Sequence, residues 1–311
     1  MNKENVQNSN LITIMVPTYN RLDKLRKCVK SIFSQTCSDF DLVISDNAST
    51  DGTREYLRNS VHWPNMSIHF SETNNGSIRN HEKCIEMSET EWVVFVSDDD
   101  WIVPEFVSKV LRVVRSSKSS VVLPGFSCRN VKGKTIYSYC PEERFYGPQQ
   151  TLLEMFLRAE DQRICCAGIA GFIVRKNDLV NLLPMRSYPG FFYFDTYLFF
   201  CMSMISGIQT IDEILYFRTE WEGSTTKANS NLRNQRIARK YFISDFRSHF
   251  LTQSASWDPV DRDIVFNALR SYERKTPFTI RRRLGRIGMV RSFLDLDLIK
   301  RSRKKLKMIT W

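Results

Sequence analysis

Three consecutive carboxylates, Asp98, Asp99 and Asp100, follow the apolar segment 92–96 after a single serine. Such a segment is typical of a buried strand, and a strand that ends in acids brings negative charge to the carboxyl edge of a sheet, where α/β proteins bind ligands. Carboxylate oxygens suit Mg²⁺ or Mn²⁺, which hold nucleotide phosphates and stabilise a departing diphosphate. The alternative is a solvated acidic turn before a helix that begins near Pro104.

The elements that must position these acids alternate between strand and helix in the first third of the chain. Strands are predicted at 11–16, 40–44, 66–70 and 92–96. Helices are predicted at 21–35, 49–57 and 78–87, where apolar residues recur at helical spacing or cap residues precede them. This β-α-β-α-β-α-β order with short connections predicts a mainly parallel, Rossmann-like sheet that is covered by helices on both faces.

Beyond Pro104 the alternation becomes less regular. We expect helices at 104–115, at 151–158 and after Phe191, and strands at 119–123, 135–139 and 208–217. From Asn229 onward the pattern is helical throughout. The predicted organisation is a polar tail at 1–10, two halves of one domain at 11–125 and 126–228, and a helical region at 229–311 that ends in a basic amphipathic tail.

The net charge of the chain is concentrated at its C-terminal end. Of the 45 Lys and Arg residues, 13 lie in 274–311, against only Asp295 and Asp297, which accounts for the whole net charge of +11. Apolar residues alternate with these basic ones, a pattern that favours helices lying on an anionic membrane surface. Nucleic acid is not an expected partner, because no nucleic-acid module is recognisable and the body is neutral. A solvated helical tail packed on the body is the third interpretation.

Other features of the sequence point to the cytoplasm. The first five residues are polar and lack the apolar centre of a secretory signal. The eight cysteines form no Cys-x-x-Cys pair and are interpreted as reduced thiols, mostly in the core. The apolar segment 190–208 is interrupted by Asp195, and its length suits a buried helix better than a membrane span.

Four segments, taken together, resemble the family 2 glycosyltransferases of bacterial surface-polysaccharide synthesis. They are Ile-Met-Val-Pro-Thr-Tyr-Asn-Arg at 14–21, Ser-Gln-Thr at 34–36, Ile-Ser-Asp-Asn-Ala-Ser-Thr-Asp-Gly-Thr at 44–53 and Val-Ser-Asp-Asp-Asp at 96–100. The resemblance covers roughly the first third of the chain. It implies the GT-A fold, a nucleotide-diphosphate sugar donor, Mn²⁺ or Mg²⁺, and inversion at the anomeric carbon by direct displacement.

The resemblance assigns the nucleoside to the ends of the first two strands. By similarity, Asp46 and Asn47 hold the base, although the family frequently has a second Asp where this chain has Asn47. This departure weakens the assignment of uracil, but a UDP-sugar is still favoured, with dTDP, CDP and GDP as alternatives. The alternative role of the pair is to shape a turn. Further nucleoside contacts are implied for Pro17, Thr18 and Tyr19.

The same resemblance assigns binding of the diphosphate and the metal to the acid triplet and two arginines. Asp98 is assigned to the ribose or phosphate side and Asp100 to the metal, with Asp99 allowed in either role because three acids in a row permit two registers. Arg79 and Arg218 are candidates for the diphosphate, since guanidinium groups bind phosphate oxygens in pairs. Arg79 is equally compatible with a surface helix charge. Relatives carry a His soon after the position of Arg218, but this chain does not.

An inverting transfer also needs a base that takes the proton of the acceptor hydroxyl. Asp195 is the only carboxylate in the aromatic segment 191–197, where related transferases place this base. Apolar surroundings would raise its pKa, whereas a helix start opposes this. Its alternative role is a helix N-cap.

The predicted function is therefore the transfer of a sugar to a hydroxyl of a saccharide linked to polyprenyl diphosphate, at the inner face of the cell membrane, in O-antigen or capsule assembly. The pathway rests on family analogy alone. The alternative is a GT-A-like scaffold at the membrane without catalytic activity. A nucleotidyltransferase is disfavoured because the first strand is followed by Pro17, Thr18 and Tyr19 and not by a glycine-rich phosphate loop.

Overall fold

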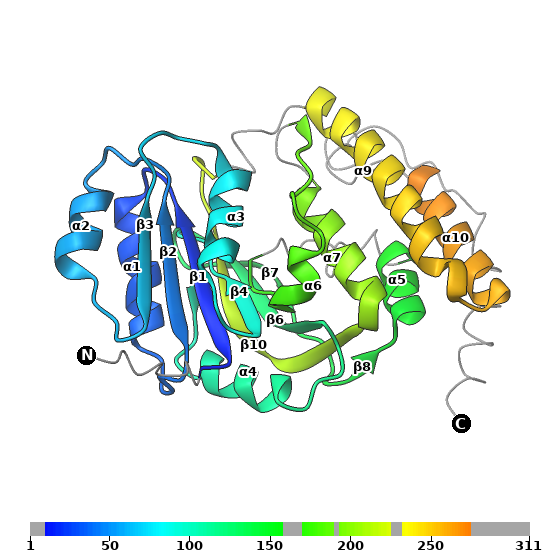
Figure 1. Ribbon diagram of the computed structural model, residues 1–311, viewed down its shortest axis with the longest axis horizontal. Coiled ribbons are helices and arrows are strands. Elements are labelled where there is room, and N and C mark those ends of the chain that lie inside the picture. The colour runs from blue at the N-terminus through cyan, green and yellow to red at the C-terminus, as the bar shows by residue number, and fades with distance from the viewer. Residues whose placement is uncertain (1–9, 158–169, 190–192, 225–231, 275–311) are drawn as a thin grey trace, which may run out of the picture.

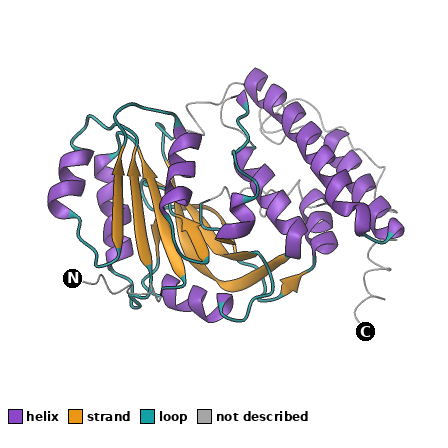
Figure 2. Ribbon diagram, in the orientation of Figure 1, coloured by secondary structure: helices purple, strands orange, loops and turns teal. Residues whose placement is uncertain are grey.

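One mixed sheet forms the centre of the protein (Figures 1 and 2). The computed structural model describes residues 10–157, 170–189, 193–224 and 232–274. Within these residues, the strand order is β3-β2-β1-β4-β9-β6-β10-β5, with β7 paired to β6 and β8 paired to β10. The strands are β1 Ile12–Thr18, β2 Asp41–Asp46, β3 Met66–Phe70, β4 Trp92–Phe95, β5 Trp101–Ile102, β6 Val121–Asn130, β7 Thr135–Tyr139, β8 Phe145–Tyr146, β9 Ile173–Arg175 and β10 Ile208–Glu220.

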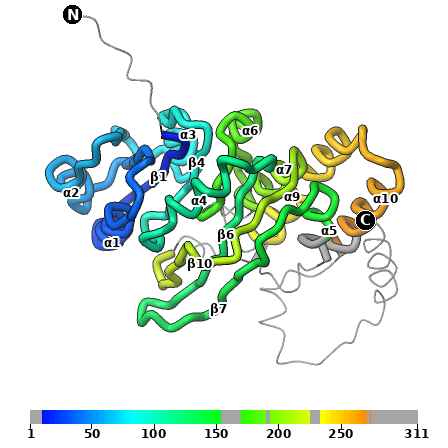
Figure 3. Tube along the Cα trace, turned by 90° about the horizontal axis from the view of Figure 1, so that it is seen from below, coloured from blue at the N-terminus to red at the C-terminus, as the bar shows by residue number. Residues whose placement is uncertain are grey.

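Helices cover both faces of this sheet. The helices that follow β1 to β5 are α1 Leu22–Phe33, α2 Thr53–Ser60, α3 Ser77–Met87 and α4 Phe106–Val114. Those of the later part are α5 Pro148–Leu157, α6 Lys176–Val180, α7 Phe194–Ser206, α9 Leu232–Gln253 and α10 Pro259–Arg274. Figures 1 and 3 place α3 on one face of the sheet and α1 and α4 on the opposite face. The predicted two-sided cover of the sheet is confirmed.

The first four long strands are parallel, as predicted. β1 pairs in parallel with β2 on one side and with β4 on the other, and β2 pairs in parallel with β3. Because both faces are covered, β1 carries apolar residues almost without interruption, and Ile12, Ile14, Met15 and Val16 are fully buried. The chain moves outward from β1 to β3 and then returns to the other side of β1. This reversal places a topological switch point between β1 and β4, where open α/β sheets bind ligands.

The sheet becomes mixed beyond β4. β9 is antiparallel to both β4 and β6, whereas β6 and β10 are parallel along ten paired positions. The two-residue strands β5 and β8 were not predicted, because two residues show no periodic pattern. The boundary placed between residues 125 and 126 falls inside β6, so both predicted halves contribute to one sheet. The division into 11–125 and 126–228 stays a prediction.

A group of helices packs at the end of the sheet that lies away from α1 and α2 (Figure 1). Phe200 of α7 contacts Phe242 and Phe246 of α9, with ring centroids 5.7 and 5.1 Å apart. The buried helix predicted for the apolar segment 190–208 is thus confirmed as α7, while residues 190–192 lie outside the described residues. Within the described part of the chain, no helix is both long and apolar enough to cross a membrane.

The helical prediction for the region after Asn229 is confirmed as far as Arg274, because α9 and α10 fill it. The basic tail after residue 274 and the pair Cys165 and Cys166 lie outside the described residues. The cysteines that the structure describes are free thiols, and they include buried Cys28, Cys84, Cys128 and Cys201.

Candidate active site

The carboxyl ends of β1, β2 and β4 bring three predicted site residues together. Thr18 is paired with Asp46 in the parallel register of β1 and β2. Its buried hydroxyl donates a hydrogen bond of 2.8 Å to Oδ2 of Asp98, two residues beyond Val96. Its carbonyl oxygen accepts from the backbone N–H of Asn47 at 3.0 Å. Thr18 therefore joins the predicted base-binding pair to the acid triplet across the switch point.

Asp98 is held by a basic residue that the sequence analysis did not assign. Nη1 of Arg21 donates to Oδ1 of Asp98 at 2.8 Å and lies 3.4 Å from Oδ2 of Asp99. Asp98 is only 2% exposed. Burial raises the pKa of its carboxyl group to about 6, because the opposing charge of Arg21 compensates only in part and the neighbouring charge of Asp99 adds to the rise.

Asp100 is held from the other half of the sheet, by β10. The hydroxyl of Tyr216 donates to Oδ2 of Asp100 at 2.7 Å, and the backbone N–H of Thr219 donates to Oδ1 at 2.9 Å. The same Tyr216 oxygen accepts from the N–H of Ser97 at 3.1 Å. Burial and the charge of Asp99 raise the pKa of Asp100 to about 7, while Arg218 opposes this rise.

Asp99 accepts a hydrogen bond from an indole N–H. Nε1 of Trp221 donates to Oδ2 of Asp99 at 2.8 Å. The ammonium group of Lys24, on α1, lies over the Trp221 ring, 3.5 Å from its centroid. This cation–π contact and the hydrogen bond together fix the ring beside the triplet. The structure thus adds Arg21, Tyr216 and Trp221 to the site.

These three residues could not have been assigned from the sequence. Arg21 ends the segment 14–21, whereas Tyr216 lies within the late strand β10 and Trp221 directly after it. The sequence shows no signal for the partners of these residues. Their contacts span about 80 to 120 residues of chain. The contact of Arg21 with Asp98 follows from the pairing of β1 with β4, whereas the contacts of Tyr216 and Trp221 depend on the pairing of β10 with β5 and β6. No local pattern encodes that pairing.

Asp195 is the second residue of α7. The helix follows Tyr193, whose φ of 66° is in the left-handed region. The N–H of Thr196 donates to Oδ1 of Asp195 at 2.7 Å. Burial raises the pKa of the Asp195 carboxyl group, and this hydrogen bond and the charge of Arg218 oppose the rise. The half-buried carboxylate is therefore more basic than an exposed Asp.

Arg218 interacts electrostatically with both the triplet and Asp195. Its guanidinium lowers the pKa of both Asp100 and Asp195, and its Nη2 donates to the carbonyl oxygen of Ala170 at 3.3 Å. Burial lowers the pKa of Arg218, but the negative charges around it, including these two carboxylates, outweigh burial and leave it raised. One fixed cation thus serves both acidic parts of the site.

Asp46 and Asn47 have structural partners of their own. Asp46 is fully buried, accepts from the N–H of Ser49, and pairs with Nε of Arg54 at 2.8 Å. The amide of Asn47 donates to Oδ1 of Asn74 at 2.8 Å and accepts from the N–H of Asn75 at 2.9 Å. These contacts match the alternative role of the two residues, which is to shape the turn after β2. The role of the pair in holding a base stays a prediction.

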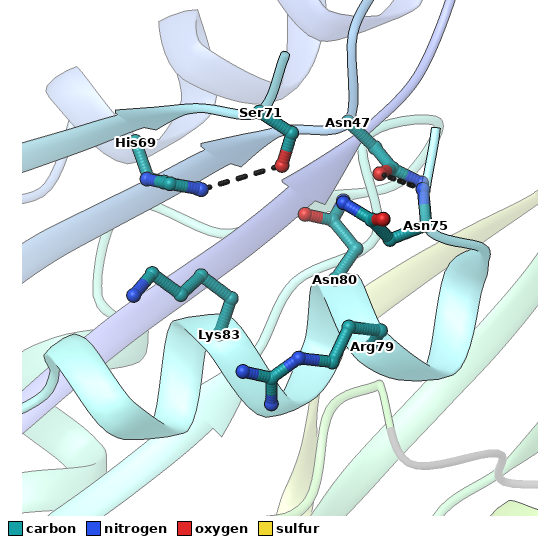
Figure 4. A pocket seen from close by; sticks show the side chains of 7 residues that line it. All are labelled: Asn47, His69, Ser71, Asn75, Arg79, Asn80 and Lys83. Carbon is teal, nitrogen blue, oxygen red and sulfur yellow. Dashed lines mark hydrogen bonds between the residues drawn. The ribbon is translucent and has the colours of Figure 1, made fainter. Parts of the chain in front are cut away.

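A small cavity of about 160 Å³ opens beside Asn47 (Figure 4). Polar and basic side chains of β3 and α3 and the loops around them line it: Asn47, His69, Ser71, Asn75, Arg79, Asn80 and Lys83. Arg79 is bonded to acids of its own helix, at 3.2 Å from Glu82 and 2.6 Å from Glu86. These pairs match the surface-charge alternative, and contact of Arg79 with a diphosphate stays a prediction.

The remaining predicted nucleoside contacts are placed at the same edge of the sheet. Pro17 is half-buried within β1, and Tyr19, which follows the strand, is 42% exposed. An exposed ring at the carboxyl edge is available to a planar ligand. Their contact with a nucleoside stays a prediction.

The acid triplet has the donor chemistry of a divalent cation site. Its oxygens are hard ligands of the kind that Mg²⁺ and Mn²⁺ prefer, and the charge of Asp99 raises the pKa of both neighbouring carboxyl groups. A cation would relieve this repulsion. Across the described ranges, no group of three or more His, Cys, Asp and Glu side chains forms a complete protein-only site. Binding of a cation by the triplet stays a prediction.

The family model for glycosyl transferase family 2 matches residues 13–179, more than half of the chain. The protein belongs to this family. An uncharacterised glycosyltransferase of Haemophilus influenzae is 29% identical over 150 residues, which are 48% of this chain and 49% of the relative. A Campylobacter jejuni GalNAc(5)-diNAcBac-PP-undecaprenol beta-1,3-glucosyltransferase is 28% identical over 103 residues, 32% of this chain and 33% of that protein. The matched part is thus half or less of these relatives.

Solved structures confirm the GT-A fold. The fragment 1–349 of S. aureus TarS, in complex with UDP-GlcNAc, aligns with a TM-score of 0.63 at 20% identity, covering 87% of this chain and 76% of that fragment. The Pyrobaculum calidifontis mannosyltransferase PcManGT, in complex with GDP-Man and Mn²⁺, aligns with a TM-score of 0.51 at 14% identity, covering 97% of this chain and 82% of that one. The predicted family and fold class are both confirmed.

The raised pKa values of Asp98 and Asp100 predict that stability falls as pH rises. In the folded protein these values are about 6 and about 7, above the ordinary 3.8. These two groups therefore make their full contribution to the free energy of unfolding below about pH 4. This contribution is lost as the pH rises through the pKa values of the folded state. Asn at position 100 stays neutral at every pH. We therefore expect the free energy of unfolding of Asp100→Asn to fall by on the order of 2 kcal/mol less than that of the wild type between pH 5 and 7.5, which corresponds to about 4 °C in Tm.

The measurement is thermal unfolding across this pH range without added divalent cation. Asp23→Asn is the matched control, because Asp23 is an exposed carboxylate on α1, and it should keep the wild-type pH dependence. An Asp100→Asn protein with the same pH dependence as the wild type would contradict the raised pKa.

Proposed function

We propose that the protein is an inverting glycosyltransferase that uses a nucleotide-diphosphate sugar donor and a divalent cation. The observation that carries the proposal is the meeting of Thr18, Asp46 and the buried acid triplet at the switch point of a GT-A sheet, in a chain that belongs to glycosyl transferase family 2. A buried surplus of carboxylate charge suits a cation and a diphosphate better than it suits folding alone.

The donor would lie along the carboxyl edge of β1, β2 and β4. Asp46 and Asn47 would hold the base, Asp98 would contact the ribose or phosphate side, and Asp99 and Asp100 would be the metal ligands. A bound Mg²⁺ or Mn²⁺ would neutralise charge that develops on the leaving diphosphate. Arg218 would add a fixed positive charge there, a role supported by its electrostatic interaction with Asp100 and Asp195.

In the transfer, an acceptor hydroxyl oxygen attacks the anomeric carbon from the side opposite the diphosphate. The new C–O bond forms as the bond from that carbon to the phosphate oxygen breaks, and the nucleoside diphosphate leaves with the electron pair. A carboxylate oxygen of Asp195 takes the hydroxyl proton. Burial helps this step, because it makes Asp195 a stronger base.

The substrates are proposed from chemistry and from the relatives. TarS was solved with UDP and with UDP-GlcNAc, which supports a UDP-sugar as the first donor to test. The Campylobacter relative is named for a saccharide on undecaprenyl diphosphate, and a Bacillus subtilis relative, 26% identical over 140 residues, is named for teichuronic acid biosynthesis. We propose a polyprenyl-diphosphate-linked saccharide as the acceptor, in O-antigen or capsule assembly.

Nucleotide binding tests this assignment directly. We expect one of UDP, GDP, CDP and dTDP to raise the Tm of the wild type in the presence of Mn²⁺, because a ligand of the folded state stabilises it by about 2.7 kcal/mol at 100 times its Kd. Asp100→Ala should lose this shift, and Asp23→Ala should keep it. No shift with any of the four nucleotides would favour the non-catalytic scaffold.

Removal of the proposed base should affect turnover and not donor binding. Asp195→Asn keeps the size of the side chain but cannot accept the proton, so we expect kcat to fall about 100-fold or more while the nucleotide-induced shift in Tm is unchanged. The control is Asp212→Asn, an exposed carboxylate on β10. Near-wild-type turnover of Asp195→Asn would remove this residue from the role.

The charge pattern of the tail leads us to propose peripheral attachment to the inner face of the cell membrane through 274–311. A variant that loses four basic residues should bind phosphatidylglycerol vesicles on the order of 1,000-fold more weakly, since each charge contributes about 1 kcal/mol near an anionic surface. The four substitutions to Gln are at Arg301, Arg303, Lys304 and Lys305.

The matched control removes the same charge from the exposed surface of the body. Its substitutions to Gln are at Lys27, Arg115, Lys132 and Lys134. Vesicle binding should be nearly unchanged in this control. Equal weakening in both variants would mean that net charge and not the tail determines binding.

A further inference from the structure

A second cavity, of about 350 Å³, lies between the segment 184–189 and α9. Its volume is in the range of small-molecule sites, and it is separate in its lining residues from the acid triplet. The segment leads toward α7, which carries Asp195. The ring of Tyr188 contacts that of Tyr197 on α7 edge to face, with centroids 6.4 Å apart. The cavity therefore adjoins the helix of the proposed base.

The charged side chains in this cavity form a nearly neutral pair. Asp245 of α9 accepts a hydrogen bond of 3.0 Å from the hydroxyl of Tyr188, and Nε of Arg186 lies 4.0 Å from the same oxygen, Oδ2. Within the described residues, the other oxygen, Oδ1, makes no hydrogen bond. A cavity with one cation and one anion has no excess charge to select a phosphate. It offers a guanidinium donor and a carboxylate acceptor, the groups that bind hydroxyls.

An aromatic side chain completes the cavity. Tyr241 of α9 lines it and is 57% exposed, a large apolar surface left in contact with water. Arg186 is also partly exposed, and its guanidinium lies over the ring of Tyr197 at 5.9 Å, which restricts its position. An exposed ring next to fixed polar groups suits a ligand that is apolar on one face and rich in hydroxyls at its edges. Pyranose sugars have this character.

We propose that this cavity binds a sugar residue of the acceptor saccharide, with Tyr241 as its stacking surface and Asp245 and Arg186 as its hydroxyl-binding groups. The proposal rests on the proposed function. It assigns acceptor recognition to the segment 184–189 and α9. Figure 1 shows α9 on the side of α7 that lies away from the first three strands.

The test is saturation-transfer-difference NMR on the full chain. The probes are the methyl glycosides of glucose, galactose, N-acetylglucosamine, N-acetylgalactosamine and mannose. We expect at least one glycoside to give a signal with the wild type. Tyr241→Ala and Asp245→Asn should each weaken its binding about tenfold, the effect of losing a stacking surface or a hydrogen bond to a charged group.

Two matched controls should keep the wild-type signal. Leu251→Ala removes a side chain that is 51% exposed on the same helix outside the cavity, and Asp263→Asn removes an exposed carboxylate from α10. Because Asp245→Asn also changes the acceptor of the Tyr188 hydroxyl, its Tm is measured alongside. Tyr241 is exposed, so Tyr241→Ala keeps the test decisive if the other variant unfolds.

The shift in Tm with UDP and Mn²⁺ is recorded on the same samples. If the nucleotide binds but no glycoside gives a signal, or if the signal survives both cavity variants, the acceptor proposal is overturned while the proposed function stands. If neither nucleotide nor glycoside binds, both fail. Loss of the glycoside signal in Tyr241→Ala with an unchanged nucleotide shift supports the acceptor site alone.

Discussion

The buried negative charge at the end of β4 is the constraint on which the rest of the site depends. Two of the three carboxylates, Asp98 and Asp100, are almost completely removed from water. Carboxylates in such a place are costly unless cations and donors surround them. Arg21 comes to them from the start of α1, and Tyr216 and Thr219 come from β10. Elements far apart in the sequence must therefore meet at this point.

The hydrogen bonds around the triplet also join the two parts of the sheet. β4 and β10 are separated in the strand order by β9 and β6, yet the Tyr216 hydroxyl contacts both Ser97 and Asp100. Arg218, two residues further along β10, interacts with Asp195 on α7. The proposed donor and acceptor sides thus share a single strand, and their relative position is fixed by it.

The first half of the fold could be predicted because its signals are local. β3 and β7 match the predicted bounds, and α1 and α3 differ by one or two residues at their ends. The predicted site residues Thr18 and Asp98 meet because parallel neighbours end at the same edge. The partners of Asp99 and Asp100 could not be predicted in this way. They depend on the irregular pairing of β10, which has register shifts and is parallel to β6 but antiparallel to β5.

The position of Trp221 beside the triplet has a consequence for the fluorescence of the protein. Its indole N–H is bonded to Asp99, and its ring lies under the ammonium group of Lys24, so its surroundings depend on the charge state of the triplet. A cation that coordinated Oδ2 of Asp99 would compete with the indole for that oxygen. The emission of this tryptophan, one of six in the chain, would then change in wavelength or intensity. The protein in effect carries an intrinsic fluorescent reporter beside the place where its ligands are proposed to bind.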